Sequence, residues 1–295
     1  MSAPEIPVIR GLREIATGYD ALIVDLWGVI HGGTAPYPGV LETLDGLRAA
    51  GSPVGLLSNA PRRAATAVRR LTEIGVPPEA YDVLMTSGEA THEALATRQD
   101  PDHAALGRRF FFVGPDWDGD LVTDLDYRAV ETVEKADFML CVGLFDEADP
   151  ISQYDELFGS ARDRGLAMIC VNPDLVVHRQ SGVTSPCAGL LAQHYRESFE
   201  GRVIYHGKPD PKIFRRCAEA LGMGEGARVL VVGDSLTTDI EGARAAGYDS
   251  LFVTRGIFAG ELGIEPGDEP DPAKVAALCA RYGERPVAAI ATLRW

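Results

Sequence analysis

The 295-residue sequence lacks paired cysteines. Its five cysteines are scattered and form no CxxC pair: Cys141, Cys170, Cys187, Cys217 and Cys279. This usage predicts neither a disulfide framework nor a structural zinc site. We therefore expect a protein of a reducing compartment, the cytoplasm.

Long apolar runs are also missing. Nowhere do about 18 apolar residues follow one another, which is the length that a membrane-spanning helix needs. The first twenty residues, MSAPEIPVIRGLREIATGYD, show no basic region followed by an apolar segment, as a signal peptide would. We expect a soluble chain without a targeting segment or a membrane partner.

Basic charge is scarce, since 28 Lys and Arg stand against 43 Asp and Glu, a net charge of −15. Nucleic-acid binding draws its affinity from clustered basic side chains, so no nucleic-acid partner is expected. The one basic run, RRAATAVRR at 62–70, has the spacing of a solvated helix face. The sequence does not set the oligomeric state and leaves a homo-oligomer open.

Short apolar segments alternate with amphipathic ones along the chain. Fully apolar strands separated by helices indicate a parallel sheet covered on both faces, so the fold class predicted is a doubly wound α/β fold. The segments predicted as strands include ALIVDLW (21–27), PVGLLSN (53–59), RVLVVGDS (228–235) and SLFVT (250–254).

A second series of such segments lies in the middle of the chain and is long enough to close a core of its own. It contains RRFFFVG, ADFMLCVG, the helical ISQYDELFGSARDRG, and LAMICVNPD. We therefore expect a core domain over residues 1–89 and 203–295 and a smaller α/β domain inserted over residues 90–202.

Polar residues follow the predicted core strands where those strands end. In open parallel sheets, ligands bind at the carboxyl ends of the strands. Three carboxylates gathered at one edge require a cation, and hard oxygen ligands select Mg²⁺. The candidates are Asp25, Ser58, Asn59, Asp234 and Asp239, with Lys208 in the loop HGKPDPK.

These residues suit phosphoryl transfer. A carboxylate such as Asp25 can attack phosphorus and form an aspartyl-phosphate. Ser58 and backbone N–H groups can hold the equatorial phosphate oxygens, and Lys208 offsets negative charge. Each segment alone fits an ordinary turn or cap, so the indication comes from their joint occurrence.

The segments resemble the four signature motifs of the haloacid dehalogenase superfamily: VDLWG, LLSN, HGKPDP and VVGDSLTTD. Insertion of a domain between the second and third motifs, with VNPD (171–174) and PCAGLLA, resembles the class IIA, NagD-like phosphatases. This resemblance implies a Rossmann-like core with an inserted α/β cap, Mg²⁺ as cofactor, and a small phosphorylated substrate.

The resemblance also implies roles for single residues. Asp25 would be nucleophile and metal ligand, and the backbone carbonyl of Trp27 would be a further metal ligand. Lys208 would be the catalytic charge partner, and Asp234 with Asp239 would complete the metal site. Ser58 would bind phosphate, with Asn59 and Asp174 at more peripheral substrate-binding positions.

The sequence departs from the family at one position. Phosphatases of the family carry a general acid two residues after the nucleophile, where this chain has Trp27. An indole cannot transfer a proton. Three explanations stay open: substrates with good leaving groups, replacement of the acid by His31, Asp174 or His178, or loss of hydrolysis.

Two other functions also follow from that departure. Dehalogenating relatives lack the second aspartate, but they need no acidic metal pair, and this chain keeps Asp234 and Asp239. A non-catalytic protein that binds a phosphorylated metabolite would explain Trp27. It would not explain why Asp25 and Lys208 are retained.

Overall fold

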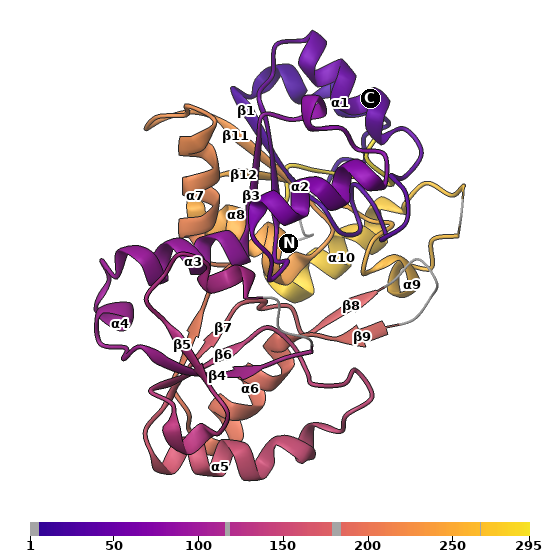
Figure 1. Ribbon diagram of the computed structural model, residues 1–295. Coiled ribbons are helices and arrows are strands. Elements are labelled where there is room, and N and C mark those ends of the chain that lie inside the picture. Colours follow the sequence, from indigo (N-terminus) through magenta and orange to yellow (C-terminus); the bar gives the residue numbers. More distant parts are fainter. Residues whose placement is uncertain (1–5, 116–118, 179–183, 266) are drawn as a thin grey trace. The chain divides into compact units, whose positions relative to one another are not determined.

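The computed structural model describes residues 6–115, 119–178, 184–265 and 267–295 (Figure 1). The chain forms two compact units. The first contains residues 6–58, 68–85 and 208–295, and the second contains residues 59–67 and 86–207. Each unit has its own sheet and its own hydrophobic core.

A six-stranded sheet with the order β13-β12-β11-β1-β2-β3 forms the centre of the first unit. The ladders from β13 to β2 are parallel. The strands are β1 (Ala21–Asp25), β2 (Val54–Ser58), β3 (Val83–Thr86), β11 (Val229–Gly233), β12 (Asp249–Val253) and β13 (Ala288–Ile290).

Helices cover both faces of this sheet, as alternate strand residues show. Leu251 and Val253 of β12 pack in the cluster that contains α1 residues such as Leu44. Phe252 packs in another cluster with Val275 of α10. The helices are α1 (Val40–Ala49), α2 (Ala64–Glu73), α7 (Pro211–Ala220), α8 (Glu241–Ala246), α9 (Ala259–Leu262) and α10 (Pro272–Tyr282).

The second unit repeats this design around a five-stranded parallel sheet of order β10-β7-β6-β4-β5. Its strands are β4 (Arg109–Val113), β5 (Arg128–Val130), β6 (Phe138–Cys141), β7 (Ala167–Cys170) and β10 (Val203–Tyr205). Its helices are α3 (Ser87–Thr97), α4 (Pro101–Ala104), α5 (Asp155–Asp163) and α6 (Ala188–Phe199), and β8 (Val176–His178) pairs antiparallel with β9 (Thr184–Pro186).

The predicted fold class, a doubly wound α/β core with an inserted α/β domain, is confirmed. The expected boundaries at residues 90 and 202 stay a prediction. β10 pairs with β7 and so belongs to the second sheet, although the sequence placed residues 203–205 in the core. The second unit also includes residues 59–67, which precede the expected insertion.

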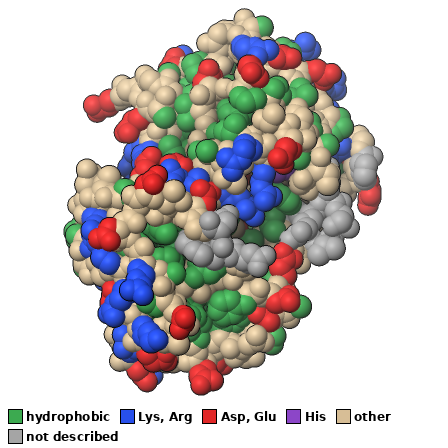
Figure 2. All heavy atoms as spheres, in the orientation of Figure 1, with side chains coloured by type: hydrophobic (Ala, Val, Ile, Leu, Met, Phe, Trp, Pro, Cys, Tyr) green, Lys and Arg blue, Asp and Glu red, His purple; other side chains and the backbone are tan. Residues whose placement is uncertain are grey.

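The surface carries both signs of charge. On the face drawn in Figure 2, acidic and basic side chains are interspersed. Within the described part of the chain, no helix is both long and apolar enough to cross a bilayer.

Candidate active site

Two acids meet at the carboxyl edge of the first sheet because their strands are parallel neighbours. Val24 of β1 pairs with Val232 of β11, and each strand ends one residue later. Asp25 is the last residue of β1, and Asp234 directly follows β11. The predicted proximity of these two carboxylates is therefore a property of the strand register.

Asp239 and Lys208 complete this set. Asp239 lies in a π-helical turn, Leu236–Ile240, that follows β11. The ammonium of Lys208 donates to Oδ1 of Asp25 at 2.5 Å and to Oδ1 of Asp239 at 2.7 Å. All four residues are buried, and none is more than 7% exposed. Buried charges persist only when they are paired, so this set is an organised polar site within the core.

Negative charge exceeds positive charge in the set. Ligand oxygens of Asp25, Asp234 and Asp239 lie within 4.8 Å of one another. Burial, followed by the charges of Asp25 and Asp239, raises the pKa of Asp234 well above its usual value. The backbone N–H of Ile257 donates to Asp234 Oδ2 at 3.0 Å and partly opposes this rise.

The chemistry of the donors fits Mg²⁺. Three carboxylates against one ammonium leave two negative charges, which a divalent cation neutralises, and carboxylate oxygens are the ligands that Mg²⁺ prefers. Two glycines also crowd the cluster. A Cβ at Gly28 or Gly256 would lie 2.1 or 1.8 Å from Asp234 Oδ2, so the backbone approaches this carboxylate as only glycine allows.

Ser58 reaches the same sheet edge from β2. Asp25 pairs with Leu57, so Ser58 stands one residue beyond that pair, at the end of its strand. Its side chain is buried. The structure thus brings Ser58, Asp25, Asp234, Asp239 and Lys208 to one edge of the first unit, as the sequence predicted.

Asn59 and Asp174 come together inside the second unit. Asn59 Nδ2 donates to Asp174 Oδ1 at 2.8 Å, across 115 positions of sequence. Asn59 is buried, and Asp174 is half-buried. The structure therefore joins these two predicted residues in a direct bond to each other.

Trp27 begins a tight loop after β1. The N–H of Gly28 donates to the carbonyl of His31 at 3.0 Å, and the rings of Trp27 and His31 meet edge to face with centroids 5.4 Å apart. Gly33, at φ +111°, lies against the indole, where a Cβ would be 3.0 Å from Cη2. The backbone carbonyl of Trp27 therefore lies in a loop whose side chains are well packed.

His31 is held in its neutral form. The N–H of Gly33 donates to His31 Nδ1 at 3.0 Å, and burial lowers the pKa of His31 to about 4. A neutral imidazole is a poor proton donor at pH 7, which disfavours His31 as a replacement for the missing acid. The side chain of His178, the other histidine considered, lies outside the described part of the chain.

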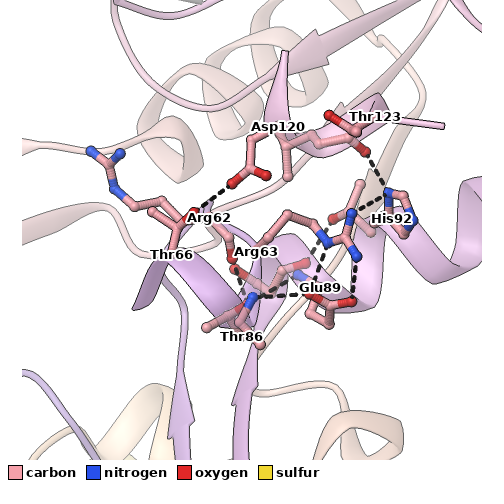
Figure 3. Close-up of polar contacts among 12 residues, drawn as sticks. Arg62, Arg63, Thr66, Thr86, Glu89, His92, Asp120 and Thr123 are labelled. Atoms are coloured by element: carbon pink, nitrogen blue, oxygen red, sulfur yellow. Dashed lines mark hydrogen bonds and ion pairs between the residues drawn. The ribbon is translucent and has the colours of Figure 1, made fainter. Parts of the chain in front are cut away.

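Sequence reasoning missed an ion-pair cluster at the start of α3, drawn in Figure 3. The guanidinium of Arg63 donates to both carboxylate oxygens of Glu89 at 2.8 and 3.0 Å, and to His92 Nδ1 at 3.0 Å. The N–H of Ala64 also donates to Glu89, at 2.9 Å. Arg63 was expected to lie on a solvated helix face, and only the fold shows its partner.

A histidine pair was also missed. His103 Nδ1 donates to Asp100 at 2.7 Å, and Nε2 of His103 lies 2.9 Å from Nε2 of His206. His103 is buried, whereas His206 is half-buried. Because 103 residues separate the two histidines, no local spacing could have signalled this contact.

Comparison with known proteins agrees with this geometry. A family model described as haloacid dehalogenase-like hydrolase matches residues 22–128, and a HAD-hydrolase-like model matches residues 205–278. A hydrolase of the haloacid dehalogenase-like family from Brucella suis 1330 is 32% identical, with 97% of this chain and 99% of that chain aligned and a TM-score of 0.79. This chain belongs to the haloacid dehalogenase-like hydrolase family.

Other relatives of this haloacid dehalogenase-like hydrolase are phosphatases. D-glycerol 3-phosphate phosphatase of Mycobacterium tuberculosis is 29% identical over 83% of this chain and 66% of its own length, so this chain spans just under two thirds of that relative. The structure of a glycerol phosphate phosphatase from M. tuberculosis with magnesium has a TM-score of 0.62 at 28% identity, over 82% of this chain and 70% of that chain. The predicted haloacid dehalogenase family is confirmed, and the magnesium in that relative's structure agrees with the Mg²⁺ predicted for the three carboxylates of this chain.

Proposed function

We propose that this chain hydrolyses a phosphate monoester of a small metabolite with Asp25 as nucleophile. The observation that carries the proposal is the buried bond of Lys208 to both Asp25 and Asp239. An ammonium fixed on Oδ1 of Asp25 pairs with that carboxylate and orients it, as a nucleophile requires.

The reaction has two steps. A carboxylate oxygen of Asp25 forms a bond to phosphorus while the bond from phosphorus to the ester oxygen breaks, and the electron pair leaves with that oxygen. Water then attacks phosphorus of the aspartyl-phosphate and gives up a proton, which passes through solvent to the departed ester oxygen. The bond from phosphorus to Asp25 breaks, which releases inorganic phosphate and restores the carboxylate. Lys208 lowers the negative charge that the entering phosphate meets, and Ser58 is positioned to donate to a phosphate oxygen.

Asp25, Asp234, Asp239 and the carbonyl of Trp27 would hold Mg²⁺. When bound, Mg²⁺ supplies positive charge that orients the phosphate and reduces the electrostatic repulsion between the phosphate and the carboxylate of the nucleophile. Retention of the acidic set also favours phosphatase over dehalogenase activity, because dehalogenation has no use for a divalent cation. The structure of NagD from E. coli is similar to this one, which supports the fold expected for such a phosphatase.

We further propose a cytoplasmic location and a small phosphorylated substrate, without nucleic-acid or membrane partners. The five cysteines, all within the described residues, are buried and form no disulfide, which suits a reducing compartment. Glycerol 3-phosphate is a sensible first substrate to test, because a relative carries that activity in its name. A homo-oligomer stays open.

The direct test is release of phosphate from p-nitrophenyl phosphate and glycerol 3-phosphate with and without Mg²⁺. We expect Asp25→Asn to lower kcat by at least about 10³-fold, because the amide is not a nucleophile. Circular dichroism confirms that the variant is folded. A wild-type protein that binds phosphate but turns over neither ester would instead support the non-catalytic alternative that Trp27 suggests.

A further inference from the structure

Asn59 occupies the centre of a polar contact between three segments of the second unit. Its Nδ2 donates to Asp174 Oδ1 at 2.8 Å, and its backbone carbonyl accepts from Ser87 Oγ at 2.8 Å. Asn59 is only 3% exposed. A buried amide held at both its backbone and its side chain has one orientation.

Gly207 belongs to the same contact. Its backbone has φ +115°, and a Cβ at this position would lie 2.4 Å from Oδ1 of Asn59. The amide oxygen of Asn59 thus fills the space that a side chain at residue 207 would need. Because an ionised Asp174 can only accept, the Asn59 amide must present Nδ2 to Asp174 and Oδ1 to Gly207.

Asp174 is fixed on its backbone as well. Its N–H donates to Asn172 Oδ1 at 3.0 Å, and its carbonyl accepts from the N–H of Gly189 at 3.1 Å. A Cβ on Gly189 would lie 2.5 Å from that carbonyl oxygen, so α6 begins with a close approach to this loop. The carboxylate of Asp174 is therefore presented to Asn59 from a rigid support.

The chain passes between the two units directly beside this contact. Asn59 follows Ser58, and Gly207 precedes Lys208, so the contact joins two of the four passages of the chain between the units, on the side of the second unit. Ser58 and Lys208 are the proposed phosphate ligand and the proposed partner of the nucleophile. A shift of Asn59 would reach Ser58 through one peptide link, and it would reach Lys208 through the close approach of Asn59 to Gly207.

We propose that Asn59 and Asp174 are a positioning pair, whose hydrogen bond sets the placement of Ser58 and Lys208. This inference rests on the proposed function for the roles of those two residues. It replaces the expectation that Asn59 and Asp174 bind substrate directly. It also disfavours Asp174 as the group that supplies the missing proton.

A reciprocal swap tests the pair. Asn59→Asp places two carboxylates against each other, whereas the double variant Asn59→Asp/Asp174→Asn restores one donor and one acceptor with the direction reversed. The swapped carboxylate still presents an oxygen to Gly207. We expect kcat for p-nitrophenyl phosphate to fall about 10- to 100-fold in Asn59→Asp, with a smaller change in KM, and to recover to within about threefold of wild type in the swap.

The control is Asp163→Asn, which removes one exposed carboxylate at the end of α5 and should leave kcat unchanged. Circular dichroism and Tm are measured for every variant. A swap that restores Tm but not kcat would overturn the proposal, because Asp174 would then act on the substrate itself. A single variant with lowered Tm and wild-type kcat would overturn it too, since the bond would be structural only.

Binding of inorganic phosphate in the presence of Mg²⁺, measured by calorimetry, separates this inference from the proposed function. If the wild type shows no turnover but binds phosphate, and affinity falls in Asn59→Asp and returns in the swap, the pair stands and the phosphatase fails. If turnover is present and the swap rescues neither kcat nor affinity, the pair fails alone. Absence of both turnover and phosphate binding in the wild type overturns both.

Discussion

Under the proposed function, Trp27 limits the kind of phosphate ester that this chain can cleave. An indole offers one N–H and no titratable proton near neutral pH, so the leaving oxygen must depart without help from this position. His31 is neutral, and Asp174 is bonded to Asn59. With these two groups disfavoured, two explanations with a functioning enzyme are left: His178 replaces the acid, or the substrate has a leaving group that is already a weak base.

The variant Trp27→Asp should reveal this dependence. A carboxyl group at this position can protonate a leaving oxygen, so rates should rise most for alkyl phosphates and least for p-nitrophenyl phosphate. General acid catalysis contributes about 10²- to 10⁴-fold, which sets the upper range for the gain. The measurement is kcat/KM with Mg²⁺ over phosphate esters of graded leaving-group pKa.

Trp27→Phe is the matched control, because it removes the indole without adding an acid. It should show no gain that depends on the leaving group. If Trp27→Asp changes all esters by the same factor, the leaving-group explanation is wrong.

Glu89 stabilises the second unit in a pH-dependent way. Burial acts to raise its pKa, but the bonds from Arg63 and from the N–H of Ala64, with the charge of Arg63, lower the pKa below the usual value. The native state therefore favours the ionised form more than the unfolded chain does. This contribution is fully present above the unfolded pKa of about 4.3 and is lost as the pH falls through the lower native pKa.

We expect Glu89→Gln to lower the free energy of unfolding by about 1–3 kcal/mol at pH 7, because a charge-assisted pair becomes a neutral one. The difference from wild type should shrink as the pH falls below about 4, where wild-type Glu89 also becomes neutral. Urea unfolding at several pH values measures it. A difference that stays constant down to pH 3 would contradict the assignment.

At the scale of helices, two glycines in the second unit allow a comparison. Gly88 lies at the start of α3, where a Cβ would be 2.4 Å from the backbone oxygen of Arg62. Gly159 lies inside α5, where the nearest atom, on Phe199, would be 3.9 Å away. The first glycine is required by a close approach of two segments, and the second is not.

Alanine at these positions should therefore have opposite effects. Gly88→Ala forces α3 away from residue 62 and should lower the free energy of unfolding by about 1–3 kcal/mol. Gly159→Ala gains helix propensity and should raise it by about 1 kcal/mol. Urea unfolding of both variants checks this, and equal effects would show that the approach of Arg62 to α3 is not tight.

The elements that the sequence predicted well are those with a local signal. β1 and β11 are continuous apolar runs because both faces of their sheet are covered, and the acids follow because parallel strands end at one edge. β10 has only three residues, and nothing in them tells which sheet they join. Arg63 with Glu89 and His103 with His206 depend on the fold alone.

For the molecule as a whole, the core acids link stability to Mg²⁺. Three buried carboxylates destabilise the metal-free protein, and a cation that binds only the native state stabilises it by mass action. At a Mg²⁺ concentration 100 times the dissociation constant this gain is about 2.7 kcal/mol. Chelation of Mg²⁺ should therefore lower the Tm of the wild type.

The variant Asp234→Asn should separate the repulsion between the buried carboxylates from the stabilisation by bound Mg²⁺. It removes one of the mutually repelling charges, so the metal-free variant should be at least as stable as the metal-free wild type, while the rise of Tm with Mg²⁺ should largely disappear. Asp45→Asn, on the exposed side of α1, is the control and should keep the full rise. Thermal unfolding with EDTA and with increasing Mg²⁺ measures the Tm without metal and its rise with Mg²⁺. If the Tm of Asp234→Asn rises with Mg²⁺ as much as that of the wild type, the stabilising cation binds somewhere other than this cluster.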